Sequence, residues 1–112
     1  MNPSDLYTQT LSQLGATEVS LTSPQGSALI QASSSVDHQD AMELVLDVHQ
    51  ARLALANVAL SSIADKLSAN EAALTAGTAA VKAALQRLDN LAQILTTVGS
   101  LIDTVGKIVP MV

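Results

Sequence analysis

Few side chains in this sequence could take part in chemistry, and they are scattered along it. His38 and His49 are the only residues that titrate near neutral pH. A zinc site needs about four nitrogen, sulfur or oxygen ligands, and neither histidine has a converging set of such residues around it. We therefore expect no metal site. We interpret His49 as a polar or partly solvated helix contact and His38 as a solvated residue near a helix start.

Paired carboxylates are the other source of reactivity, because two of them can share general acid–base catalysis. Glu43 and Asp47 lie one helical turn apart, and such a pair on a surface helix is usually solvated. Asp89 and Asp103 are too far apart along a helix to act on one bond. The sequence also lacks a Gly-rich phosphate loop and the G-x-S-x-G and H-E-x-x-H motifs. We therefore predict a protein that is not an enzyme, with no catalytic residue and no cofactor.

Composition narrows the class of protein further. The 112 residues are 48% hydrophobic but only 1% aromatic, and Tyr7 is the single aromatic residue. Such a chain is of single-domain length, with a core of Ala, Leu, Val and Ile. The net charge is −5, and the five Lys and Arg residues are too scattered to form a phosphate-binding patch. We expect no nucleic-acid partner.

The ends and the apolar stretches of the chain bear on its location. The absence of Cys leaves the redox compartment open. The first residues show no basic segment followed by an apolar run, so we expect no secretory signal. The longest uncharged apolar stretches, 53–64 and 91–102, are shorter than the ~20 residues that a bilayer span needs. We expect a cytoplasmic protein, or one exported by a non-classical route.

The clearest pattern is a seven-residue repeat over 88–109. If Leu88 takes heptad position a, then positions a, d and g are always large and aliphatic, and positions b, c and f are polar. A repeat of this kind indicates a helix that packs against other helices. Position e is small, with Ala92, Gly99 and Gly106 in turn. Because glycine inside a helix costs about 1 kcal/mol relative to alanine, we interpret Gly99 and Gly106 as sites of close helix–helix approach.

This repeat belongs to the second of two predicted long helices. Helix B is expected over about 69–109, after a capping box of Ser68 and Glu71 and before Pro110, which cannot continue a helix. Gly77 and its neighbouring alanines permit close helix approach early in helix B.

Helix A is predicted over about 38–67, with Asp37 as its N-cap. It is apolar on two nearly opposite faces, and a helix of this kind is normally buried on both. One face is a seam of residues in steps of four and three, and the other is a set that lies opposite the seam. The seam is Met42, Leu46, His49, Leu53, Ala56, Leu60, Ile63 and Leu67, and the opposite set is Leu44, Val48, Ala51, Leu55 and Val58.

Together the two helices would form a long antiparallel hairpin over 37–112. At 1.5 Å per residue, helix B would extend about ten residues past helix A. The apolar end of helix B and the second face of helix A would both need a cover, and several uncovered aliphatic residues would form a patch of the kind that marks an interface.

Residues 1–36 form a polar N-terminal arm that is rich in Ser, Thr and Gln. A short helix over 5–14, ended by Gly15, is predicted at its start. Alternating residues on either side of Ser23-Pro-Gln-Gly26 hint at a β-hairpin over 17–33. A flexible arm is an equally good interpretation, because an isolated hairpin is marginal in water.

The fold class that these patterns predict is all-α, a helical hairpin that assembles into a helical bundle or larger oligomer. We interpret the chain as a non-enzymatic structural or adaptor protein that self-associates through its long helices. One alternative is a membrane-active pore-forming or translocation component, and another is a small partner-binding module such as an immunity protein or chaperone. The interface residues that we expect are Leu88, Leu91, Ala92, Leu95, Val98, Gly99, Leu101, Ile102, Val105, Gly106, Ile108, Val109, Leu44, Val48, Leu55 and Val58.

In style the chain resembles subunits of bacterial helical assemblies and substrates of specialised secretion machines. The resemblance lies in its small size, its lack of Cys, its scarcity of aromatic residues and its polar N-terminal segment. No motif assigns it to a family, so the resemblance transfers no site residue.

Overall fold

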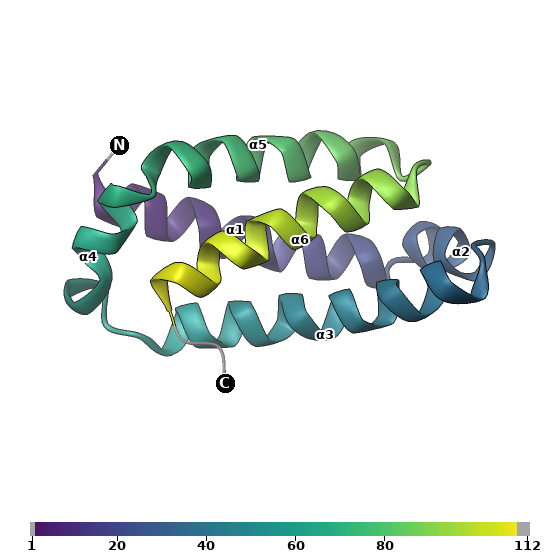
Figure 1. Cartoon of the computed structure of the whole chain (residues 1–112), viewed down its shortest axis with the longest axis horizontal. Helices are drawn as coiled ribbons and strands as arrows, with labels where there is room; N and C mark the ends of the chain where they lie inside the picture. The colour runs from purple at the N-terminus through teal and green to yellow at the C-terminus, as the bar shows by residue number, and fades with distance from the viewer. Residues whose placement is uncertain (1, 110–112) are drawn as a thin grey trace.

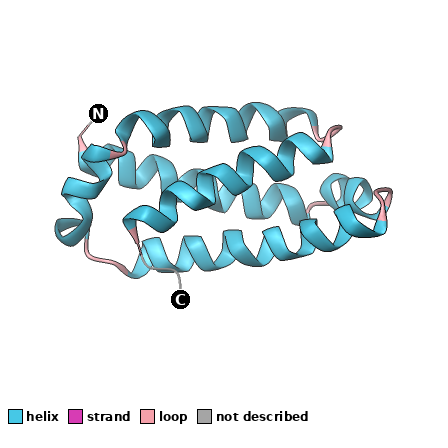
Figure 2. Ribbon diagram, in the orientation of Figure 1, coloured by secondary structure: helices cyan, strands magenta, loops and turns pink. Residues whose placement is uncertain are grey.

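Six α-helices build residues 2–109, the part of the chain that the computed structural model describes. They are α1 (Pro3–Thr22), α2 (Pro24–Gln31), α3 (Ser35–Asn57), α4 (Leu60–Ala69), α5 (Glu71–Arg87) and α6 (Leu91–Ile108). These residues contain no β-strand (Figure 2). The predicted all-α class is confirmed.

Four of the helices, α1, α3, α5 and α6, extend along the length of the molecule, and the short helices α2 and α4 lie at opposite ends (Figure 1). Each long helix packs on two others, in the order α1, α3, α6, α5 and back to α1. The most extensive contact joins α5 to α6, and α4 rests mainly on α1. The result is a compact globule that measures 42 × 26 × 19 Å.

The core between these helices consists almost entirely of aliphatic side chains. α6 contributes the most, because positions d and g of its repeat all face inward, with Ile94 and Val98 fully buried. α1 adds Leu6, Leu14 and Leu21, although this segment looked polar overall. Burying one such side chain contributes about 1.5–3 kcal/mol. Both ends of the described chain are therefore needed to close the core.

The N-terminal segment is helical throughout, and the β-hairpin predicted over 17–33 is wrong. α1 does not end at Gly15 but continues to Thr22, because Thr17 and Leu21 are spaced by four residues and join its buried face. The turn predicted at Ser23 joins two helices instead of two strands. Ser23 ends α1, and its hydroxyl accepts the backbone N–H of Gly26 in the first turn of α2 at 3.1 Å.

Gly26 is required at this corner between α1 and α2. α2 turns back so tightly that a Cβ on residue 26 would overlap the carbonyl oxygen of Ser20 and lie 2.9 Å from that of Leu21. Both obstacles are backbone atoms, which cannot rotate away as a side chain could. The glycine is thus explained by close approach and not by a strand turn.

Helix A, predicted over 38–67, is in fact two helices. α3 ends at Asn57, and Val58 and Ala59 are extended before α4 begins. Val58 is β-branched and favours extended backbone, but no Gly or Pro marks the break. The cause is tertiary, because the bend lets α4 cross the end of the bundle and bury Ile63 and Leu67.

Helix B, predicted over 69–109, is also two helices, so the long hairpin is wrong. α5 is followed by Leu88 in the left-handed region, at φ 49° and ψ 38°. Asn90 then caps α6 by accepting the N–H of Gln93 at 3.1 Å. This turn folds α6 back along α5, which buries the apolar faces of both helices.

The reversal at Leu88 also removes the predicted overhang. The apolar face of α6 is covered by α3 and α5, so the end of the chain needs no outside cover up to Val109. Gly77 allows this packing, because a Cβ there would lie 3.3 Å from Cδ1 of Leu101 on α6. The close helix approach predicted at Gly77 is confirmed.

Two predicted boundaries lie close to the observed ones. The turn predicted at Ser68–Glu71 is the junction of α4 and α5, although Asn70, and not Ser68, precedes the first residue of α5. α3 begins earlier than predicted, because the side chain of Ser34 caps it by accepting the N–H of Asp37 at 3.2 Å. Pro110, the predicted stop of helix B, lies outside the described residues.

Candidate functional site

The outer face of α3 carries three large apolar side chains that the bundle leaves uncovered. Met42 is 51% exposed, Leu46 61% and Leu53 43%. Their spacing places them on one side of the helix, over about 16 Å of its length. We call these three residues the α3 stripe. The opposite face of α3 is buried and consists of Ala41, Leu44, Val48, Ala51 and Leu55.

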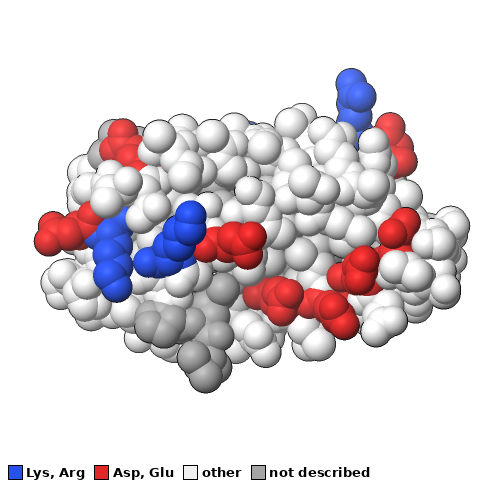
Figure 3. Space-filling view, in the orientation of Figure 1, with Lys and Arg blue, Asp and Glu red and all other residues white. Residues whose placement is uncertain are grey.

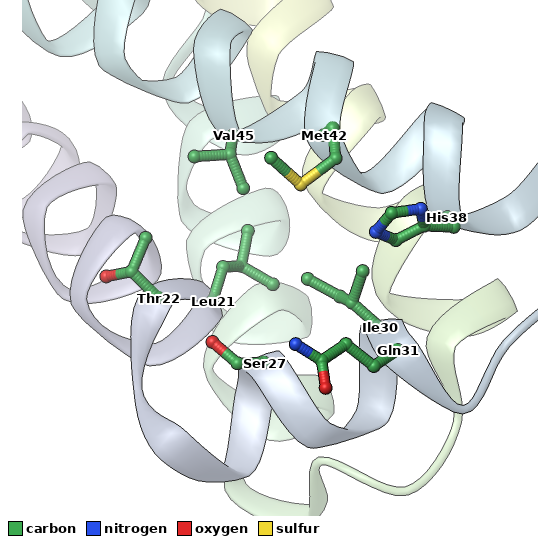
Figure 4. Close-up of a pocket in the computed structure, with 8 residues that line it drawn as sticks. All are labelled: Leu21, Thr22, Ser27, Ile30, Gln31, His38, Met42 and Val45. Atoms are coloured by element: carbon green, nitrogen blue, oxygen red, sulfur yellow. The ribbon is translucent and has the colours of Figure 1, made fainter.

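A shallow pocket of about 340 Å³ adjoins one end of the α3 stripe, where α1, α2 and α3 meet (Figure 4). Leu21, Ile30, Met42 and Val45 point toward one another and form its apolar floor. Because Met42 belongs to both, the pocket and the α3 stripe are one continuous surface. The remaining lining residues carry polar groups and are Thr22, Ser27, Gln31 and His38.

A second pocket, of about 390 Å³, lies further along the seam between α1 and α3. Tyr7 lines it, and its hydroxyl donates a hydrogen bond to the backbone carbonyl of Leu55 at 2.9 Å. This bond ties the start of α1 to the end of α3. The other lining residues are Thr8, Leu11, Ser12, Gly15, Arg52 and Ala56.

Between the two pockets, three charged or polar side chains join α1 to α3. Oε1 of Glu18 lies 2.7 Å from Nδ1 of His49, and Nε of Arg52 donates to Oε2 of Glu18 at 2.6 Å. His49 and Arg52 are spaced by three residues, so both reach the same carboxylate from one side of α3. We call this group the Glu18 clasp. It lies at the surface, since the His49 and Arg52 side chains are 45% and 35% exposed.

The clasp makes Glu18 a stronger acid. Its hydrogen bond with His49 does most to hold the pKa of Glu18 below the ordinary value of 4.5, and the hydrogen bond and charge of Arg52 act in the same direction. Partial desolvation of the carboxylate opposes them. Exposed ion pairs contribute about 0–1 kcal/mol, so the clasp sets the alignment of α1 on α3 more than it stabilises the fold.

His49 makes the polar, partly solvated helix contact that its position predicted. The partner was missed because Glu18 was placed in a separate arm. The only signal in the sequence is that Glu18 is one of two charges in residues 1–36, the other being Asp5. A carboxylate in so polar and uncharged a segment is a candidate for a long-range partner.

Charge is divided unevenly between two halves of the chain. Residues 1–57, which build α1, α2 and α3, hold six acidic residues and one basic residue, Arg52, whereas residues 58–112 hold four of each. The whole net charge of −5 thus belongs to the first half. Acidic side chains follow α3 in the space-filling view (Figure 3), and α3 carries Asp37, Asp40, Glu43 and Asp47.

Two of these acidic residues border the α3 stripe. Glu43 directly follows Met42, and Asp47 directly follows Leu46, so each is turned about 100° from a stripe residue. Both are exposed. On the other side of the stripe lie Val45, in the first pocket, and the clasp residues. The stripe therefore has an acidic edge and a pocketed edge.

Within residues 2–109, no group of three or more His, Asp or Glu side chains could hold a metal ion. The carboxylates of Asp89 and Asp103 are exposed at different ends of the α6 segment. None of the helices α1 to α6 combines the length and apolarity needed to cross a membrane.

Most of the interface residues predicted from the sequence lie in the chain's own core. Leu88, Leu95 and Val58 are half-buried, whereas Ala92 and Gly106 are exposed. Within the chain, Gly99 is not a site of close approach, because a Cβ added to it would meet no atom within 4 Å. Contact between copies through these residues stays a prediction. The buried members are Leu91, Val98, Leu101, Ile102, Val105, Ile108, Val109, Leu44, Val48 and Leu55.

No family model, curated protein or solved structure matches this chain. The argument for function therefore rests on the surface of α3 and on what lies beside it.

Proposed function

We propose that this protein is a non-enzymatic component of a larger assembly, and that it binds another polypeptide through the outer face of α3. The exposure of Met42, Leu46 and Leu53 carries this proposal. Three large apolar side chains in a row on one helix are a costly use of surface, and such patches mark sites of protein association.

The geometry of the α3 stripe suits a helix better than an extended segment. The stripe follows the helical spacing of its own residues, and apolar residues of a second helix can pack between them. Covering one aliphatic side chain fully contributes up to about 1.5–3 kcal/mol. Three half-exposed residues and a pocket that adjoins them are sufficient for a specific contact of modest affinity.

The alternative of a membrane-active form is less well supported. It requires the apolar face of α6 to turn toward lipid, but Val98, Leu101 and Val105 are at most 1% exposed and fill the centre of the bundle. Insertion would have to open the whole fold. The exposed face of α3, in contrast, is available without any rearrangement.

Site-specific photocrosslinking in the native host tests the proposal. A photoreactive amino acid replaces Leu46 in one variant and Val19 in a matched control, since Val19 is also exposed, at 69%, but lies on α1 outside the α3 stripe. We expect a discrete crosslinked product at position 46 and none at position 19. The mass of the product shows whether the partner is a second 11.5 kDa copy or another protein.

Equal products at both positions, or none at position 46, would contradict the proposal. Circular dichroism of both variants checks that the helices are intact, which removes unfolding as an explanation.

A further inference from the structure

We infer that the partner of the α3 stripe is a basic amphipathic helix of a different protein, whose Lys or Arg residues face Glu43 and Asp47. This inference rests on the proposed function and specifies the chemistry of the partner. Three features of the surface carry it: its acidic edge, its pocketed edge and the distribution of charge in the chain.

The acidic edge selects the charge of the partner. Glu43 and Asp47 are one helical turn apart, both exposed, and each is the direct neighbour of a stripe residue. A helix laid on the stripe would bring its own flanking side chains next to these two carboxylates. Lys or Arg there would gain attraction, and Asp or Glu would be repelled, so the edge discriminates between partners.

Basic groups within this half of the protein cannot neutralise that edge. Arg52 is the only Lys or Arg in residues 1–57, and its guanidinium is bound to Glu18 in the clasp on the other side of the stripe. The acidic edge therefore faces solvent with its charge available to a partner.

The pocketed edge selects a large apolar side chain. The pocket beside Met42 has a floor of four aliphatic residues, and its volume of about 340 Å³ accommodates one leucine or aromatic side chain from a partner. Buried anchors of this kind carry most of the energy in protein interfaces. A partner helix would place such an anchor toward α2 and its cations toward Glu43.

A second copy of this chain matches the surface poorly. Its own α3 carries four acidic residues and a single Arg, and its net charge is also −5. In an antiparallel contact of two α3 helices the two acidic edges would lie next to each other and repel. The chain also lacks Phe and Trp, and its single Tyr is hydrogen-bonded to Leu55, so an aromatic anchor has to come from another protein.

Binding of two synthetic peptides to the intact protein tests the inference. One is an amphipathic peptide of about 18 residues, long enough to form a helix, with Leu and one Trp on its apolar face and Lys on both flanks. The other has Glu in place of every Lys. We expect the Lys peptide to bind about tenfold more tightly at low salt, with Trp fluorescence as the readout and a preference that shrinks as salt is added.

Variants separate a specific edge from general attraction. The double variant Glu43→Lys, Asp47→Lys should reverse the preference and favour the Glu peptide. The control double variant Asp65→Lys, Asp103→Lys changes the net charge equally at exposed residues of α4 and α6, and it should still prefer the Lys peptide. Leu46→Ser should weaken the Lys peptide about tenfold or more, whereas Val19→Ser should leave it unchanged.

Two results would overturn the inference. One is equal binding of both peptides, and the other is a preference that reverses in the control double variant as well, which would show attraction by net charge alone. A crosslink from position 46 to a second copy, with no peptide binding, would also overturn it but would leave the proposed function standing. Absence of any crosslink at position 46 would remove the proposed function itself.

Discussion

α3 and α6 pack against each other, yet they use their apolar residues in different ways. α6 turns its large aliphatic residues almost entirely inward, and the most central of them, Ile94, Val98, Leu101 and Val105, are at most 1% exposed. α3 buries one apolar face and leaves Met42, Leu46 and Leu53 in solvent. Burial of the α6 face stabilises the fold, whereas the outer face of α3 contributes little to it and is available for binding.

The same division appears in the charge of the two halves. The half that contains α1, α2 and α3 carries the entire net charge of −5, and the half that contains α4, α5 and α6 is balanced. A balanced half suits a structural support, and a charged half with an exposed apolar stripe suits recognition. The comparison therefore separates a stabilising half from a binding half.

Truncation of one leucine in each helix should sharpen this comparison most. Leu101 of α6 is 1% exposed and Leu46 of α3 is 61% exposed. Leu101→Ala should lower the free energy of unfolding by about 2–5 kcal/mol, because it opens a cavity in the core. Leu46→Ala should change it by less than about 0.5 kcal/mol. Urea denaturation of both variants gives the two values, and similar losses would contradict the division.

Alanine at one glycine of each half should have effects of opposite sign. Gly26→Ala should destabilise the fold by about 1–3 kcal/mol, because the new methyl group overlaps backbone atoms of α1. Gly99→Ala should stabilise it by about 1 kcal/mol, because the site is open and alanine is the better helix former. The thermal midpoints give both signs.

The same Gly99→Ala variant examines the predicted contact between copies. If Gly99 packs against a second chain, the methyl group should lower the oligomer mass in light scattering. An unchanged mass with a higher midpoint would mean that Gly99 faces solvent in the protein as it exists in solution.

Removal of the Glu18 charge should have the smallest effect, and one that depends on pH. The pKa of Glu18 is lowered in the folded state, so its contribution to stability is present above 4.5 and is lost as the pH falls through the lowered pKa. Glu18→Gln should therefore cost at most about 1 kcal/mol at neutral pH and nothing at the acid end. Urea titrations at several pH values follow this difference, and Glu43→Gln controls for the loss of one negative charge. A cost that is constant with pH would contradict the clasp.

Part of this fold is predictable from local patterns. The repeat over 91–108 identified the buried face of α6, because a regular apolar spacing indicates an inward face whatever covers it. The junction before Glu71 and the close approach at Gly77 were also predictable, since capping residues and missing side chains act locally.

The breaks between helices were not predictable, because no local signal causes them. Val58 and Leu88 are ordinary residues that leave helical backbone only because the chain gains contacts by turning. Leu88 even adopts a left-handed conformation that is unfavourable for a leucine. The packing of α6 on α5 and α3 offsets that cost, and this is a property of the folded chain and not of a window of sequence.

The candidate site was half visible in the sequence. Met42, Leu46 and Leu53 belong to one of the two apolar faces recognised on helix A, but the choice of buried face depends on where α1 and α6 lie. His49 was identified, whereas its partner Glu18 is 31 residues away. A pair so distant leaves no periodic trace, and only the packing of α1 on α3 brings it together.

The single tyrosine has a consequence for how this protein can be observed. With no Trp in the chain, Tyr7 supplies the intrinsic fluorescence, and it sits where α1 meets the end of α3. The emission therefore reports on the closure of those two helices alone, whereas far-ultraviolet circular dichroism reports on every helix at once. Two melting curves that coincide would mean that the binding half and the stabilising half unfold as one unit, and a gap between the curves would give the binding half a melting transition of its own.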